Sequence, residues 1–425
     1  MHLLSNTLRD YAWGSPTAIA ALLGREPSGR PEAELWIGAH PDGPSRMVDG
    51  ETSVPLHEAI AADPAAALGP ESVEAFGPRL PFLLKVLAAD SPLSLQVHPT
   101  LDQARAGFAA EEAAGVDRSA PHRNYKDDNH KPEMLFALTS FEALCGFRAP
   151  AEAAALFERL TGLVAGTDAA EVTEQVAELL RGPDEAAALA AAFGRLIEGG
   201  RDVRSCVDAV AAAVGIHLSP GGAHRPGRDD DAVLRTVVDL AAQYPSDPGV
   251  LISLILNRVS LAPGEALYLP AGNVHAYLKG VGIEVMASSD NVLRGGLTPK
   301  HVDVAELLRT VVFAPSEVPV LAAQESDLGQ ELYRPPFAEF QLQRIAVAAD
   351  GSRPAPVPVA QAGAAVVLVV DGSLTLDTPK GDLALGRGQS AFVPDAEAPA
   401  LAHPGPEGVL AFAVTTGLRS ASGLA

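Results

Sequence analysis

The chain has 425 residues, of which 47% are apolar and 20% are charged. This balance is typical of a soluble globular protein, and the length predicts two or three domains. Acidic residues outnumber basic ones by 53 to 31, and the formal charge of -22 argues against nucleic-acid and anionic-membrane partners. The sequence shows no signal-peptide pattern, no apolar run of membrane-spanning length and only two cysteines, so we expect a cytoplasmic protein without a disulfide framework.

The first 150 residues contain many short apolar runs bounded by Pro and Ser. They predict strands over 81–89 and 93–99, and a strand pair within 134–147. The character then changes, because residues 151–214 carry strong helix formers with apolar residues at helical spacing. A loop rich in Gly and Pro follows at 218–230. This part of the chain therefore predicts a helical unit that interrupts a β-rich one.

The remaining chain returns to strands after one more helix. We expect a helix over 229–244, strands within 252–278 and a further helix over 301–312. From about residue 337 the pattern consists of short strands and turns, with hairpin signals at Asp371-Gly372 and Gly381-Asp382. The last part therefore predicts a small β-barrel or jelly roll.

Four residues with metal-binding side chains lie at informative positions. Gln96 and His98 are two apart in a predicted strand, so their side chains share a face. His275 begins a strand after the sharp turn PAGN, and Glu133 follows Pro132, which would break any helix before it. Two histidines and one glutamate form a common catalytic zinc set, but a glutamine ligand is less usual. The residue chemistry alone therefore leaves manganese and iron open.

The lysines are few and unevenly placed. Only six occur, and five of them fall within 80–100, 125–135 and 268–300, namely Lys85, Lys126, Lys131, Lys279 and Lys300. A lysine can bind phosphate or take part in proton transfer. The enrichment predicts a basic pocket in an otherwise acidic protein.

Several segments, in order along the chain, resemble the type I mannose-6-phosphate isomerase (phosphomannose isomerase) family, which consists of zinc enzymes of the cupin superfamily. The matching segments include YAWGS (11–15), ELWIGAHPDGPS (34–45), QVHP (96–99), NHKPE (129–133), PAGNVHAY (270–277) and SDNVLRGGLTPK (289–300).

The resemblance implies a mainly β fold with an α-helical insert. Its parts would be a cupin (jelly-roll) catalytic barrel at 1–150 and 251–325, a helical insert at 151–250, and a second jelly-roll-like β-domain at 326–425. It also implies a monomeric enzyme that interconverts mannose 6-phosphate and fructose 6-phosphate through an enediol-type intermediate. The cofactor would be one Zn²⁺ per chain.

The same resemblance implies the roles of individual residues. The zinc ligands would be Gln96, His98, Glu133 and His275, and Arg294 would be the catalytic arginine. The sugar phosphate would meet Ser94, Lys131, Lys300 and Asp290. Three residues are candidates for moving the proton, Glu284, Lys131 and His130, and the sequence does not choose among them.

Two other functions are compatible with a metal-binding cupin. One is an iron-dependent oxygenase, although Gln96 replaces an expected nitrogen ligand and the lysine-rich motifs would have no purpose. The other is a non-catalytic sugar-phosphate sensor, although the complete ligand set argues against an inactive enzyme. Glu34 and His40 are further candidates for lining the pocket or for orienting a ligating histidine.

Overall fold

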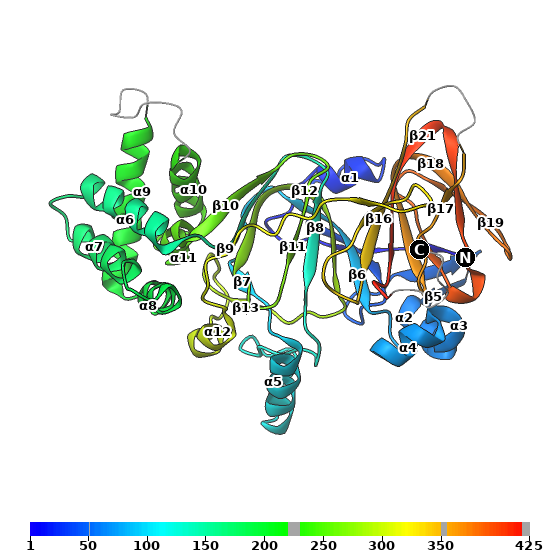
Figure 1. The fold of residues 1–425 in the computed structure, drawn as a ribbon, viewed down its shortest axis with the longest axis horizontal. Helices are drawn as coiled ribbons and strands as arrows, with labels where there is room; N and C mark the ends of the chain where they lie inside the picture. The colour runs from blue at the N-terminus through cyan, green and yellow to red at the C-terminus, as the bar shows by residue number, and fades with distance from the viewer. Residues whose placement is uncertain (51, 220–229, 350–354, 419–425) are drawn as a thin grey trace.

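The structure is a computed structural model, and it describes residues 1–50, 52–219, 230–349 and 355–418. Three blocks lie in a row, with a β-sheet in the middle, a helical unit at one end and a second β-sheet at the other (Figure 1). The predicted fold class, mainly β with a helical insert, is confirmed.

The middle sheet is antiparallel, and ten of the described strands belong to it. Its main path runs β10-β9-β12-β6-β3-β2, and β7, β8, β11 and β13 pair beside it. β6 has the sequence FLLKVLAA and is buried at every position, because it lies between β3 and β12. The strands are β2 (Thr7–Arg9), β3 (Glu34–Gly38), β6 (Phe82–Ala89), β7 (Gln96–Val97), β8 (Glu133–Ala137), β9 (Phe141–Phe147), β10 (Leu256–Leu261), β11 (Ala266–Leu269), β12 (His275–Ala287) and β13 (Leu293–Arg294).

The second sheet is also antiparallel, and eleven described strands belong to it. Its path runs β14-β15-β16-β21-β18-β20-β1-β4-β5, with β17 and β19 beside it. Its strands are β1 (His2–Ser5), β4 (Arg46–Asp49), β5 (Thr52–Pro55), β14 (Gln324–Glu325), β15 (Glu331–Tyr333), β16 (Gln341–Val347), β17 (Val357–Pro358), β18 (Ala365–Thr378), β19 (Gly381–Gly386), β20 (Ser390–Val393) and β21 (Leu401–Thr415).

The two sheets do not divide the chain as the predicted domains do. β1 pairs with β20, and His2 lies opposite Phe392. The first strand therefore belongs to the same sheet as the last hundred residues, and the domain boundaries at 150, 250 and 325 stay a prediction. Side chains of both sheets also share one apolar core, in which Phe82 and Phe136 of the middle sheet join Phe412 of the second.

The helical unit packs on the middle sheet through aromatic contacts. In α7 the buried positions recur every three or four residues, so one face of the helix is apolar. Phe193 of this unit contacts Phe147 of β9 at 6.0 Å between ring centroids. The helices here are α6 (Pro150–Leu163), α7 (Ala169–Leu180), α8 (Glu185–Ile197), α9 (Arg201–Leu218), α10 (Asp230–Gln243), α11 (Gly249–Ile252) and the 3-10 turn η1 (Ser253–Ile255).

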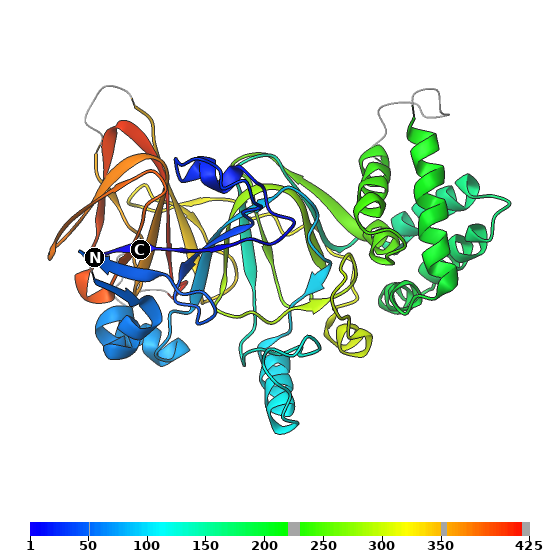
Figure 2. The same ribbon diagram turned by 180° about the vertical axis from the view of Figure 1, so that it is seen from behind.

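The other helices cover the two sheets, and α5 and α12 lie on the same side of the middle sheet (Figure 2). A Thr100–Gln103 capping box begins α5, and the Gln103 amide donates to the carbonyl of Arg309 in α12 at 3.1 Å. These helices are α1 (Ala18–Leu22), α2 (Leu56–Ala62), α3 (Pro64–Leu68), α4 (Pro70–Phe76), α5 (Leu101–Ala113), α12 (Val304–Thr310) and the 3-10 turn η2 (Asp395–Glu397). No helix in the described part of the chain has both the length and the apolar character needed to cross a membrane.

Two local predictions differ from the structure, and a third is mostly untested. The strand predicted over 93–99 is reduced to the two residues of β7. Asp371-Gly372 is not a hairpin but a register shift inside β18, whereas Thr378 and Gly381 do close a hairpin. Most of the loop predicted at 218–230 lies outside the described residues.

Candidate active site

Three predicted metal ligands converge at the middle sheet. His98 follows β7, Glu133 begins β8 and His275 begins β12, and none is more than 2% exposed. One ligand atom from each lies within 4.8 Å of the others. The Glu133 carboxylate lies 3.3 Å from Nε2 of His98 and 3.4 Å from Nε2 of His275.

The other ring nitrogens of the two histidines fix their tautomers. Nδ1 of His98 contacts the carbonyl of Asn291 at 2.8 Å, and Nδ1 of His275 contacts the carbonyl of Asn273 at 3.0 Å. A carbonyl can only accept, so each Nδ1 donates and each Nε2 presents a lone pair. Burial lowers the pKa of His98 to about 4, which favours the neutral ring.

Both Nε2 atoms are buried and have no hydrogen-bond partner in the described structure. Two buried lone pairs that face one carboxylate repel each other unless a cation lies among them. The donor set of two imidazoles and one carboxylate fits a divalent transition metal.

Gln96 lies beside this cluster. In the strand ladder Gln96 is opposite His275 on one side and Arg294 on the other. Gln96 is thus adjacent to His275 in the sheet, and its role as a fourth ligand stays a prediction. The turn before His275 is held by Gly272, which has φ +79 and donates its N–H to the carbonyl of His98 at 2.9 Å. A Cβ there would lie 2.4 Å from a Val312 methyl, so the turn requires glycine.

A cavity of about 420 Å³ opens next to the metal cluster. Its lining includes six predicted site residues, Ser94, Gln96, Lys131, Asp290, Arg294 and Lys300. Tyr11, Trp13 and Trp36 supply aromatic surface. Of the five lysines in the enriched stretches, Lys85, Lys126, Lys131 and Lys300 line the cavity, whereas Lys279 is exposed elsewhere. The predicted basic pocket is therefore present.

The cations of the cavity differ in how they are paired. Lys126 forms an ion pair with Asp290 at 2.6 Å, and Lys131 lies 3.1 Å from Glu133. Burial alone would raise the pKa of Asp290, but Lys126 and Lys131 outweigh it and lower this pKa to about 2. Within the described structure, Arg294 and Lys300 have no carboxylate partner, and burial lowers the pKa of each. Their charges are available to an anionic ligand.

Lys85 forms the centre of a buried charge network. Its Nζ lies 2.9 Å from Glu284 and 3.5 Å from Glu34, and Glu34 also accepts from the indole N–H of Trp36 at 2.7 Å. Burial alone would lower the pKa of Lys85, but the two carboxylates outweigh it and raise this pKa. Burial raises the pKa of Glu284. Glu284 contacts Lys85, which lines the cavity, and is itself not among the lining residues.

The chain resembles known proteins over almost its whole length. A family model described as "Phosphomannose isomerase type I, catalytic domain" matches residues 1–150. Mannose-6-phosphate isomerase of Escherichia coli (strain K12) is 40% identical over 402 residues, which cover 94% of this chain and 96% of that protein. This chain belongs to the mannose-6-phosphate isomerase family.

More distant relatives and solved structures agree with this assignment. Human mannose-6-phosphate isomerase is 31% identical over 96% of this chain and 97% of its own length. A zinc-bound mannose 6-phosphate isomerase crystal structure superposes with a TM-score of 0.82 at 37% identity, and it covers 97% of this chain and 98% of its own. The cupin fold expected from the sequence is therefore confirmed for this member of the isomerase family.

The structure separates the three candidates for proton transfer. Lys131 lines the cavity, and Glu284 reaches it only through Lys85. His130 does not line the cavity and instead contacts Glu339, whose carboxylate lies 2.5 Å from Nε2. The local sequence could not show that the His130 side chain contacts Glu339, because the two residues are 209 positions apart.

Of the two further candidates, Glu34 lines the cavity, which is one of its two expected roles, whereas His40 does not. Neither side chain orients a ligating histidine, because the backbone carbonyls of Asn291 and Asn273 do so. His40 packs edge-on against Trp36 at 5.3 Å.

Two residues of the site were missed from the sequence. Tyr244 follows α10, lines the cavity and donates to the carbonyl of Pro92 at 2.8 Å, so the helical insert contributes to the pocket. No local pattern marks Tyr244. Asn291 was overlooked although it lies inside the quoted segment 289–300, and its carbonyl fixes His98.

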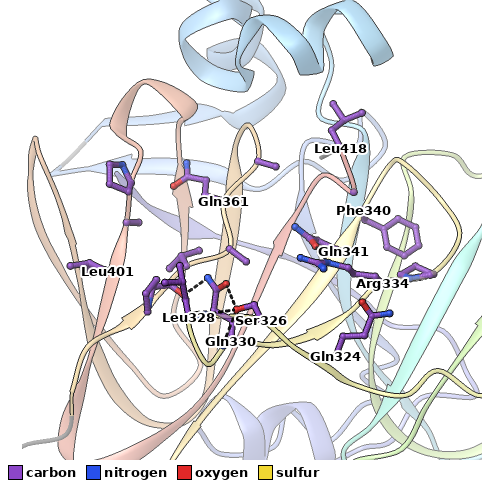
Figure 3. Close-up of a pocket in the computed structure, with 18 of the residues that line it drawn as sticks. Gln324, Ser326, Leu328, Gln330, Arg334, Phe340, Gln341, Gln361, Leu401 and Leu418 are labelled. Carbon is purple, nitrogen blue, oxygen red and sulfur yellow. Dashed lines mark hydrogen bonds between the residues drawn. The ribbon is translucent and has the colours of Figure 1, made fainter. Parts of the chain in front are cut away.

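A larger cavity of about 650 Å³ lies at the second sheet, between the segment 324–341 and the strands that follow (Figure 3). Arg334 is the one charged side chain among its described lining residues, and its Nε donates to Gln341 at 2.9 Å. This cavity lacks the grouped acids, bases and cations that isomerase chemistry needs. The cavity that contains Gln96 and Lys131 beside the metal cluster groups these side chains, so it is the candidate active site.

Proposed function

We propose that this chain is a zinc-dependent isomerase that interconverts mannose 6-phosphate and fructose 6-phosphate. The observation that carries the proposal is the buried His98–Glu133–His275 cluster directly beside a cavity with two unpaired cations. Family membership supports the same activity. An oxygenase would have no use for a cationic cavity, and a non-catalytic sensor would not need the complete ligand set.

The phosphate of the substrate is assigned to Lys300, which lines the cavity without a carboxylate partner in the described structure. Arg294 also lacks such a partner, but its place opposite Gln96 puts it nearer the reacting carbons, where it would stabilise a developing oxyanion. Thr298 and Ser94 line the same cavity and offer hydroxyl donors. The sugar carbons would then extend toward Lys131 and Gln96.

The isomerisation breaks the C2–H bond, forms a C1–H bond and exchanges the carbonyl and hydroxyl groups of C1 and C2. It needs no further reactant. Lys131 is the one proton-transfer candidate that lines the cavity, so we assign it to the reacting carbons. Lys85 and Glu284 form a buried ion pair in the same part of the site.

His98, Glu133 and His275 would hold the zinc ion, with Gln96 as the fourth ligand. A bound zinc ion supplies positive charge that stabilises a developing oxyanion. The cavity is water-restricted on the side of the cluster, because all three ligands are buried there. Arg294 lies opposite Gln96 in the strand ladder, so its positive charge would add to that of the zinc ion.

The decisive experiment removes one ligand and measures zinc content and activity together. His275→Ala should lose both zinc and mannose-6-phosphate turnover, and added zinc should not restore them. His403→Ala is the matched control, because the His403 side chain lies 3.4 Å from Asp377 in the second sheet, away from the cavity, and the variant should retain both. Wild-type protein stripped with a chelator should recover activity with zinc. Full activity in the metal-free wild type would refute the proposal.

We also infer a monomeric protein of the cytoplasm. The two cysteines, Cys145 and Cys206, are both free and buried, which supports a reducing environment. The monomeric state is what the family resemblance implies.

A further inference from the structure

One contact joins the second sheet to the active-site segment. Nε2 of His130 lies 2.5 Å from the Glu339 carboxylate, and the two side chains are only 21% and 14% exposed. Burial alone would raise the pKa of Glu339, but its contact with His130 outweighs this and lowers the pKa. By comparison, the Glu331–Arg344 pair in the same region is 34% exposed on both sides.

The residues on both sides of Glu339 in the chain are held by packing and by a backbone hydrogen bond. Its neighbour Phe340 is fully buried, and the Ala338 carbonyl accepts from the N–H of Gly417 after β21 at 2.9 Å. Phe337 packs edge-on against Tyr268 of the middle sheet at 5.8 Å. Glu339 is therefore presented by a segment that is packed between the two sheets.

The segment that carries His130 is held at two other points. The Asn129 carbonyl accepts from the Asn291 amide at 2.9 Å, and the Pro132 carbonyl accepts from the N–H of Ala287 at 3.1 Å. Ala287 is the last residue of β12 in the middle sheet, and Asn291 lies in the loop that follows this strand. His130 and Lys131 lie between these two contacts. Among the described residues, their backbone groups make no backbone hydrogen bond.

His130 and Lys131 point to different sides. Lys131 lines the active-site cavity, whereas His130 contacts Glu339. Neighbouring side chains of an extended segment alternate in direction, so fixing one fixes the other. The contact with Glu339 thus adds a third point of attachment to the stretch that carries Lys131 and leads into Glu133 of β8.

We propose that Glu339 is a positioning residue that acts through His130 to hold Lys131 and Glu133 in their working geometry. The second sheet then contributes to catalysis without touching the substrate. This inference rests on the proposed function, and it assigns His130 to positioning instead of proton transfer.

The test is a double-mutant cycle of Glu339→Gln and His130→Gln, with two readouts. These are kcat/KM for mannose 6-phosphate and the zinc dissociation constant from chelator competition. Loss of a supporting residue typically costs about 10- to 100-fold in metal affinity or activity. We expect each single variant to lose that much in at least one readout, and the double variant to lose no more than a single one. Glu331→Gln is the matched control and should change neither.

Three outcomes would overturn the inference. The first is that His130→Gln loses far more turnover than Glu339→Gln, because His130 would then transfer the proton itself. The second is that both variants keep wild-type kcat/KM and zinc affinity. The third is a lower melting temperature with both readouts unchanged, which would make the pair merely structural. A wild type that binds zinc but does not turn over substrate would refute the proposed function, and the zinc readout would still test the inference.

Discussion

Asn291 offers a quantitative test of how the active site is supported. It is fully buried, and its side chain bridges the 126–129 segment. Its Oδ1 accepts from the N–H of Lys126 at 2.7 Å, and its Nδ2 donates to the carbonyls of Asp127 at 2.8 Å and Asn129 at 2.9 Å. Its own carbonyl holds His98. Asn291→Ala removes the side-chain contacts and leaves that carbonyl in place.

The expected cost follows from the groups that are left without partners. The Asn129 carbonyl keeps the Ser289 hydroxyl at 3.1 Å, so it is not orphaned. The Lys126 N–H, the Asp127 N–H and the Asp127 carbonyl have no other partner among the described residues. An orphaned buried group costs ~1–3 kcal/mol, and these three groups are only part-buried, so the low end applies and the free energy of unfolding should fall by about 3 kcal/mol. The loosened segment also carries Lys131 and Glu133, so zinc affinity should fall by about 10-fold or more.

Urea denaturation of the zinc-loaded protein measures the first quantity, and chelator competition measures the second. Asn6→Ala is the control, because Asn6 bonds to Ser390 and Ser45 at 2.8 Å in the second sheet. It should lower stability by about 1–2 kcal/mol and leave zinc affinity unchanged. The reasoning fails if Asn291→Ala matches the wild type in both quantities, or if the control loses as much zinc affinity.

Two further predictions concern charge. Arg294→Ala should reduce kcat/KM for mannose 6-phosphate by about 10²–10³-fold while zinc content is retained, because Arg294 lines the cavity without ligating the metal; equal loss of both would make it structural. Burial lowers the pKa of His40 from its ordinary value of 6.5, so near that pH the unfolded chain binds a proton that the folded protein does not. The wild type should therefore lose unfolding free energy relative to His40→Gln as the pH falls from about 7.5 to about 5.5, and parallel pH–stability curves would contradict this.

Much of the site could be predicted because its chemistry is concentrated in short segments. Gln96 and His98 are two residues apart, and His275 follows a turn that contains Gly272, where any side chain would be strained. The lysines were informative because so few occur. A residue type that is rare elsewhere and frequent around the ligands marks a pocket before any coordinates exist.

The missing parts depend on contacts between distant segments. Periodicity could not show that His130 turns toward Glu339, or that Tyr244 reaches the cavity from the helical insert. The strand predicted over 93–99 shortened to β7 because only Gln96 and Val97 find ladder partners, in β12 and β13. A period of two indicates which face a side chain takes, but it does not show where the neighbouring strand ends.

The position of β1 has a consequence for how the protein forms on the ribosome. His2 pairs with Phe392, and Leu3 also pairs with Val48, so the first strand to be synthesised lies between an early and a late partner. The pairing of β1 with β4 can form early, but the other edge of β1 stays open until β20 emerges. Open strand edges invite pairing with other chains, and such long-range closure is slow. We expect the nascent chain to depend on protection of this edge, and C-terminal truncations before β20 to aggregate instead of leaving an intact metal-binding half.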